Sequence, residues 1–434
     1  MGKCVAHHLR HSWLALVLLA LFAAVPSRVG AQYALVVGSS GSSRVDLLNL
    51  DWNGNLTPRS SFDLWDDTLY FGDPGDLVVS SQGNYVFLYD WNYFNGALYS
   101  VDSSCDFHFI REMTDGCSGC GYYACGGGGF TTDEKYLFTS DPVVLPATHA
   151  FLMTWRLDGQ TCDLRTSQTV PTANTLTGNF LTNSLDEVMG SSLNGTIGSP
   201  DGFSVYEFDR GLERLSLKQY IPGVPCVYSA MSPTEDFVAH TWTQVVGTIV
   251  RDSQGTYTLQ SSYWDPAWGY HNGCGVCITP DSTLAVSTVS SVQGPSGPAL
   301  FSVTTQRNLV FRQFVQKDYT GPIAMTPDGR FVVVAHAEQH VGYNISLLTV
   351  FRINYSVPSL EEVSTTSIVP QGSCMKFLPQ ALATPPTKAE PTWPLYSSKS
   401  EAKPHSVAPD TANPTHGTPT MSATPPIRLA SRAR

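Results

Sequence analysis

The chain has 434 residues, of which 42% are hydrophobic, so it can bury a core and disorder is excluded over most of its length. Only 14% of the residues are charged, and the formal net charge of −11 at pH 7 disfavours nucleic acid and anionic membranes as partners and leaves cationic or neutral ligands. The chain is rich in Gly, Tyr and Phe, which favour strands and tight turns over helices. We therefore expect an all-β protein.

Residues 1–31 have the pattern of an export signal. Lys3 and Arg10 precede an apolar run from Trp13 to Val25, which Pro26 ends. This run is shorter than the roughly 20 residues that a transmembrane helix needs, and small residues up to Ala31 fit a cleavage position. We predict a signal peptide over 1–31 and a secreted or periplasmic mature protein without a membrane span.

One pattern recurs along residues 32–380: a short polar turn followed by a strand of aromatic and aliphatic residues. Its clearest copy, TPDGRFVVVA, begins at Thr326. The strand-opening residues of the six copies are Tyr85, Tyr136, Val188, Phe237, Leu284 and Phe331. They lie 47 to 52 residues apart, which is the length of a four-stranded propeller blade.

The two ends of this region supply the strands that six units lack. Residues 371–380 (QGSCMKFLPQ) predict one strand, and segments beginning at Tyr33, Ser43 and Ser60 predict three more. We predict a seven-bladed β-propeller in which N- and C-terminal strands share the closing blade, while rings of six or eight blades stay open as alternatives. A closed ring has no exposed sheet edge that must pair with another chain, so we expect a monomer.

From residue 381 the composition shifts to Pro, Thr, Ser and Ala without hydrophobic periodicity. Such a segment buries too little apolar area to offset its ordering entropy. We predict a disordered Pro/Thr/Ser-rich tail over 381–434. The glycine run Gly126–Gly129 precedes a strand and predicts a turn, not a phosphate loop.

The segment Thr326–Asn354, TPDGRFVVVAHAEQHVGYNISLLTVFRIN, resembles a blade of the lactonase-type propellers, the 6-phosphogluconolactonase-like proteins with YVTN-type repeats. Blades of that family show a Ser/Thr-Pro-Asp-Gly-Arg turn and a valine-rich strand. The resemblance implies a seven-bladed ring over residues 32–380 and a lactonase-like hydrolase acting at the axial pocket. The family's Pro-His step before the turn is absent, since the corresponding places read DPGDLVV, VPCVYSA, CGVCITP and TGPIAMT. We therefore favour an exported binding or scaffold module with an unidentified ligand, and keep the hydrolase as the alternative.

Residues just before each predicted turn line the shared axial channel of a propeller, where one ligand can meet several blades. The candidates for this axial pocket are Asp73, Asp76, Tyr122, Tyr228, Tyr270, Asp318 and Tyr319. His271 is the candidate catalytic base, because a neutral imidazole accepts a proton near pH 7. Carboxylates that cap loops and tyrosines that wedge between blades give the same pattern, so a purely structural role stays open. No cofactor is implied.

Nine cysteines follow the predicted signal peptide. Cys117 with Cys120, and Cys274 with Cys277, have the two-residue spacing of a zinc site. Oxidation is the default in an exported protein, so we predict disulfides and no metal. Cys226 and Cys274 precede the turns of adjacent blades, and we expect them to pair.

Overall fold

The structure, a computed structural model, is all-β throughout the part of the chain that it describes. The described residues are 33–39, 44–64, 74–90, 96–113, 127–141, 149–171, 176–193, 200–224, 226, 228–242, 245–264, 271–291, 294–340, 343–368 and 372–379. They belong to the first of two units into which the chain divides, Met1–Pro386 and Thr387–Arg434. The predicted signal peptide and the predicted tail lie outside the described residues. None of the described segments forms an apolar helix long enough to cross a bilayer.

The described residues form strands numbered β1 to β28. The first strands are β1 (Tyr33–Ser39), β2 (Arg44–Leu50), β3 (Leu56–Asp63), β4 (Pro74–Val79), β5 (Tyr85–Asp90), β6 (Gly96–Val101), β7 (Phe107–Glu112), β8 (Gly127–Phe130), β9 (Tyr136–Asp141), β10 (His149–Asp158), β11 (Thr161–Pro171), β12 (Leu176–Thr182), β13 (Glu187–Leu193) and β14 (Pro200–Asp209). The others are β15 (Arg214–Pro222), β16 (Tyr228–Met231), β17 (Phe237–Trp242), β18 (Val245–Arg251), β19 (Tyr257–Tyr263), β20 (His271–Ile278), β21 (Leu284–Ser291), β22 (Gly297–Val303), β23 (Leu309–Phe314), β24 (Ile323–Met325), β25 (Phe331–His340), β26 (Tyr343–Asn354), β27 (Ser359–Ile368) and β28 (Gly372–Phe377).

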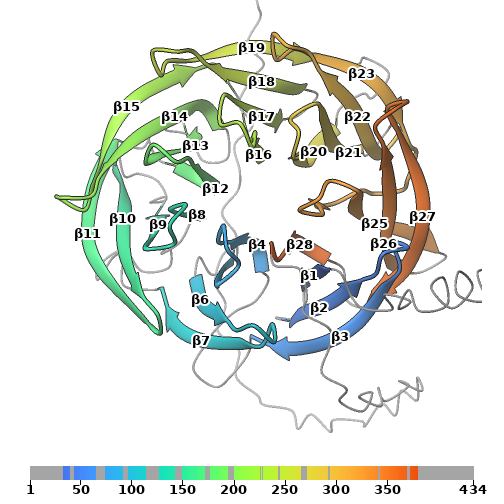
Figure 1. The fold of residues 1–434 in the computed structure, drawn as a ribbon, viewed down its shortest axis with the longest axis horizontal. Coiled ribbons are helices and arrows are strands. Elements are labelled where there is room, and N and C mark those ends of the chain that lie inside the picture. The colour runs from blue at the N-terminus through green and yellow to red at the C-terminus, as the bar shows by residue number, and fades with distance from the viewer. Residues whose placement is uncertain are drawn as a thin grey trace, which may run out of the picture. The chain divides into compact units, whose positions relative to one another are not determined.

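These strands form five four-stranded sheets and one eight-stranded sheet. One end strand of each four-stranded sheet, together with β8 and β12 of the eight-stranded sheet, contacts the next such strand in a closed cycle. The order is β28, β4, β8, β12, β16, β20, β24 and again β28. Figure 1 shows these strands innermost, with β3, β7, β11, β15, β19, β23 and β27 at the outer rim. The sheets therefore have a propeller-like arrangement, which confirms the all-β expectation.

The eight-stranded sheet arises where β8 and β12 pair in parallel, with Gly127 opposite Gly178 and Gly128 opposite Asn179. A Cβ atom on Gly127 would lie 2.0 Å from the carbonyl oxygen of Gly178, so only glycine permits this approach. The turn predicted over Gly126–Gly129 is wrong for Gly127–Gly129, which belong to β8. Glycine here allows close backbone contact rather than a change of chain direction.

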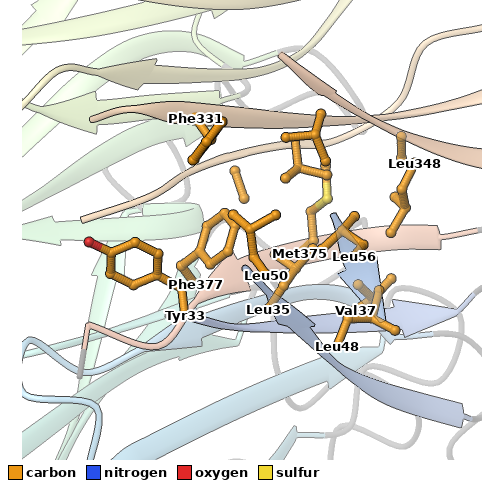
Figure 2. Close-up of a cluster of buried hydrophobic side chains, with 14 of the residues drawn as sticks. Tyr33, Leu35, Val37, Leu48, Leu50, Leu56, Phe331, Leu348, Met375 and Phe377 are labelled. Carbon is orange, nitrogen blue, oxygen red and sulfur yellow. The ribbon is translucent and has the colours of Figure 1, made fainter. Parts of the chain in front are cut away.

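Strands from opposite ends of the described region share one sheet. β1 pairs antiparallel with β28, with Leu35 opposite Phe377 and Val37 opposite Met375, as predicted for these two segments. Figure 2 shows these side chains in one buried cluster with Phe331 and Leu348 of the neighbouring sheet. Burial of this apolar area holds together strands that are more than 300 residues apart in the chain.

The sequence repeat corresponds to a repeated turn between the first and second strands. Thr326 Oγ1 donates to the Asp328 carboxylate at 2.7 Å and accepts from the backbone N–H of Phe331 at 3.0 Å. The fourth residue of every copy has a positive φ, at Gly83, Glu134, Asp186, Glu235, Ser282 and Gly329. TPDG at Thr326 and SSQG at Ser80 are thus the two copies in which glycine fills the left-handed position.

Candidate functional site

A small axial cavity lies among the innermost strands. Its polar lining comes from Asp76 on β4, Asn179 on β12, Tyr228 and Ser229 on β16 and Lys376 on β28. Side chains such as Val276, Ile323 and Met375 complete its wall. About 20 Å³ is open to the centres of water-sized molecules, which is room for one ordered water or one polar group of a ligand. Asp76 and Tyr228, two of the predicted pocket residues, are therefore brought together.

Asp76 is the buried carboxylate of this cavity, with a fractional exposure of 7%. Its Oδ1 accepts from the backbone N–H of Leu77 at 2.8 Å, and its Oδ2 accepts from the Tyr89 hydroxyl at 3.3 Å. A register shift between Pro74 and Asp76 marks a bulge in the pairing of β4 with β5, a feature that re-aims side chains next to functional sites. Burial raises the pKa of Asp76, although the positive charge of Lys376 opposes this shift.

Lys376 is the residue that sequence reasoning missed. It stands on β28 between Met375 and Phe377, both buried, and is itself half-buried. Its positive charge acts on Asp76 and on the thiol of Cys277. A lysine inside a largely apolar segment already predicted as a strand was the available signal, because a charge among buried neighbours faces either a partner or a cavity.

Asn179 was also missed. It lies on β12, and its side chain lines the cavity beside Asp76 and acts to lower the pKa of that carboxyl group. The segment LTGNFLT around it has no motif, so nothing local distinguishes this asparagine from one on a strand surface. Its place in the cavity depends on the parallel pairing of β12 with β8.

Asp318 and Tyr319, two other predicted pocket residues, do not line this cavity. Both are exposed, and Tyr319 has a positive φ of 41°. The hydroxyl of the following Thr320 donates to the carbonyl of Val289, and the N–H of Gly321 donates to the carbonyl of Ala335. These bonds anchor the chain after Tyr319, so the innermost strand begins only at Ile323.

The other predicted residues are outside the described side chains. Asp73, Tyr122 and Tyr270 fall outside the described residues. His271 opens β20, where its backbone pairs with that of Ser291, but its side chain is not among those described. For His271, the proposed catalytic base, the structure therefore gives only the position of the backbone in the sheet.

Cys226 carries a free, buried thiol, so the structure does not contain the predicted disulfide between Cys226 and Cys274. Its Sγ lies 3.6 Å from the carbonyl oxygen of Tyr228, and its neighbours include the apolar Met189 and Phe203. This burial raises the pKa of the Cys226 thiol to about 12. Cys105, Cys162 and Cys277 are free thiols as well, which indicates that apolar packing accounts for these cysteines.

Comparison with known proteins gives likeness in structure alone. No family model matches the sequence, and no curated protein matches it. The periplasmic gluconolactonase of Pseudomonas aeruginosa superposes with a TM-score of 0.61 at 14% identity, over 81% of this chain and 99% of the other. A candidate 6-phosphogluconolactonase of Bacteroides fragilis gives the same four values. A protein from Lactobacillus plantarum gives a TM-score of 0.62 at 16% identity, over 80% of this chain and 99% of its own. At these identities the likeness shows that the chain has the fold of lactonase-like propellers.

Proposed function

We propose that the protein is a binding module that holds a small polar molecule at the axial cavity. The observation that carries this proposal is the position of Asp76, a carboxylate more than nine-tenths buried that faces a cavity shared by the innermost strands. Buried carboxylates are rare unless paired or used. With Lys376 close by, the cavity offers both a hydrogen-bond acceptor and a donor to a neutral polar ligand.

Ligand screening of the purified chain tests this function. A panel of small polar molecules, including sugars, polyols, amino acids and sugar acids, is screened by thermal shift, and the hits are titrated by calorimetry. We expect at least one hit whose affinity falls tenfold or more in Asp76→Asn. The matched control is Asp252→Asn, because Asp252 is an exposed aspartate that caps a turn. A panel without Asp76-dependent hits would contradict the proposal.

Lactone hydrolysis is the second candidate. It is favoured by the fold shared with the gluconolactonase of Pseudomonas aeruginosa and by the raised pKa of Asp76, since a carboxylate with a raised pKa is a better general base near neutral pH. His271 is the other candidate base. Turnover of simple lactones that falls about a hundredfold in Asp76→Asn or His271→Ala would support it. Turnover that is unchanged in both variants would contradict these assignments.

We also infer that the ring has seven blades. The eight-stranded sheet runs inward from β11 to β8 and outward again from β12 to β15, which supports counting it as two blades joined at their innermost strands. With the five four-stranded sheets this makes seven. An experimental structure in which β8 to β15 formed a single blade would contradict the count.

We also propose that the protein is exported and that it is a monomer. Export is supported by the signal pattern of residues 1–31 and by the periplasmic gluconolactonase among the similar structures. The N-terminus of the exported protein is expected at Gln32, and its elution volume at that of a monomer. Deleting residues 385–434, which lie within the proposed tail of residues 381–434, should leave thermal unfolding unchanged.

A further inference from the structure

The axial cavity contains one polar atom that its surroundings do not satisfy. The side-chain amide of Asn179 lines the cavity beside Asp76 and acts to lower the pKa of that carboxyl group. The amide oxygen Oδ1 of Asn179 is buried and has no hydrogen-bond partner within the described part of the chain. A buried carbonyl oxygen without a partner costs free energy, so the cavity favours an incoming hydrogen-bond donor.

The charges beside Asn179 restrict which donor fits. Asp76 disfavours a carboxylate or phosphate, and the ammonium group of Lys376 disfavours a cation. Lys376 donates hydrogen bonds and cannot accept them. A hydroxyl group meets both demands, since its proton can bond to Asn179 Oδ1 while its oxygen accepts from Lys376 Nζ.

The size of the cavity agrees with a single hydroxyl. The cavity volume of about 20 Å³ holds one water or one hydroxyl group and excludes a whole sugar ring. The apolar walls formed by Val276, Ile323 and Met375 offer no further hydrogen bonds from their side chains. The cavity is thus a subsite for one group of a larger molecule.

We infer that the axial cavity binds one hydroxyl group of a polyhydroxylated ligand, a sugar or a polyol, between Asn179 Oδ1 and Lys376 Nζ. This inference rests on the proposed binding function and names its ligand class. Water takes the place of the hydroxyl in the free protein. Asn179 is a binding residue in this account, and Asp76 lies beside it in the cavity.

Calorimetric titration of the full chain with D-glucose and its monodeoxy derivatives tests the subsite. We expect one deoxy derivative to bind at least tenfold more weakly than glucose to the unmodified protein. Asn179→Leu should lose at least tenfold in affinity for glucose and bind that derivative and glucose equally. Asn53→Leu, at an exposed turn position, is the control and should bind as the unmodified protein does.

Each outcome separates the subsite from the broader function. If Asn179→Leu binds every sugar as the unmodified protein does, the subsite is wrong. If no sugar or polyol binds while another polar molecule binds in an Asp76-dependent way, the ligand class is wrong and the binding function stands. If nothing binds in an Asp76-dependent way, both are wrong.

A second variant and a crystal structure cover the case in which Asn179→Leu fails to fold. Asn179→Ser is smaller and should show the same loss of discrimination between glucose and the deoxy derivative. In a high-resolution crystal structure of the free protein we expect a water within hydrogen-bond distance of both Asn179 Oδ1 and Lys376 Nζ. A direct bond from a protonated Asp76 to Asn179 Oδ1, in place of that water, would overturn the inference.

Discussion

The side-chain amide of Gln168 binds both backbone groups of Leu215: Nε2 donates to the carbonyl oxygen at 2.7 Å, and Oε1 accepts from the N–H at 3.0 Å. Gln168 lies on β11 and Leu215 on β15, the outermost strands of neighbouring groups. Two further pairs repeat this geometry, Gln219 with Tyr257 and Gln313 with Leu360. Each glutamine therefore acts as a single β-bridge between outer strands that are not neighbours within a sheet.

Removing one such bridge should destabilise the ring. We expect Gln219→Ala to lower the free energy of unfolding by about 1–3 kcal/mol, because two hydrogen bonds are lost and the backbone of Tyr257 keeps unpaired groups. Thermal unfolding measured by circular dichroism checks this. Gln260→Ala is the control, since Gln260 is exposed and its hydrogen bond to Asn308 spans 3.5 Å. Equal effects of the two substitutions would contradict a special role for the glutamine bridge.

Substitutions at two equivalent turn positions with a positive φ should have different effects on stability. A Cβ atom on Gly329 would lie 2.4 Å from the Tyr355 hydroxyl and 2.5 Å from Pro280 Cδ, so Gly329→Ala should destabilise by at least about 1 kcal/mol. Ser282 occupies the same turn position with a φ of 60°. Ser282→Gly should leave stability unchanged or raise it by up to about 1 kcal/mol. Urea unfolding measures both, and a stabilising Gly329→Ala would contradict the account of the repeat.

Asp76 predicts a distinctive dependence of stability on pH. Burial raises its pKa above the ordinary value of 3.8, so the folded chain holds the proton of this carboxyl group more tightly than the unfolded chain does. The stability this contributes is fully present below pH 3.8 and is lost as pH rises through the folded-state pKa. Asp76→Asn removes this loss, so the stability of the variant relative to the unmodified protein should increase between pH 4 and pH 7.

Asp236 is the matched control, because its pKa is lowered whereas the pKa of Asp76 is raised. Hydrogen bonds from Thr234 and Arg307 hold its pKa below the ordinary value despite partial burial. Its contribution is present above pH 3.8 and is lost as pH falls through the folded-state pKa. Asp236→Asn should therefore become less stable than the unmodified protein as pH rises. Urea unfolding measured across this pH range checks both variants. If their stabilities relative to the unmodified protein changed in the same direction as pH rises, this assignment would be contradicted.

The buried thiols predict slow modification in the folded protein. Burial raises the pKa of both the Cys162 and Cys226 thiols to about 12, which leaves little thiolate at neutral pH. Alkylation by iodoacetamide should reach these residues only after unfolding, as peptide mass mapping would show. A disulfide from Cys226 to Cys274 in the purified protein would contradict the structure at this point.

The fold was predictable because its signals are local and repeated. The turn opened by Thr326 and the apolar run in strands such as Tyr33–Ser39 can be read within ten residues. The cavity was predictable only in part, because Asp76, Asn179 and Lys376 meet through ring closure across 300 residues of chain. The start of β24 at Ile323 was not predictable for a related reason: Thr320 is anchored to Val289 on another strand, and no local pattern records that contact.

The crystal structure of the protein with its tightest ligand from the polar panel tests the central claim most directly. We predict that a polar group of the ligand lies within hydrogen-bond distance of both Asn179 and Lys376, next to the carboxylate of Asp76, and that Asp76→Asn crystals soaked under the same conditions show a clear loss of occupancy. A ligand bound elsewhere on the ring, with the axial cavity unchanged in both crystals, would contradict the account.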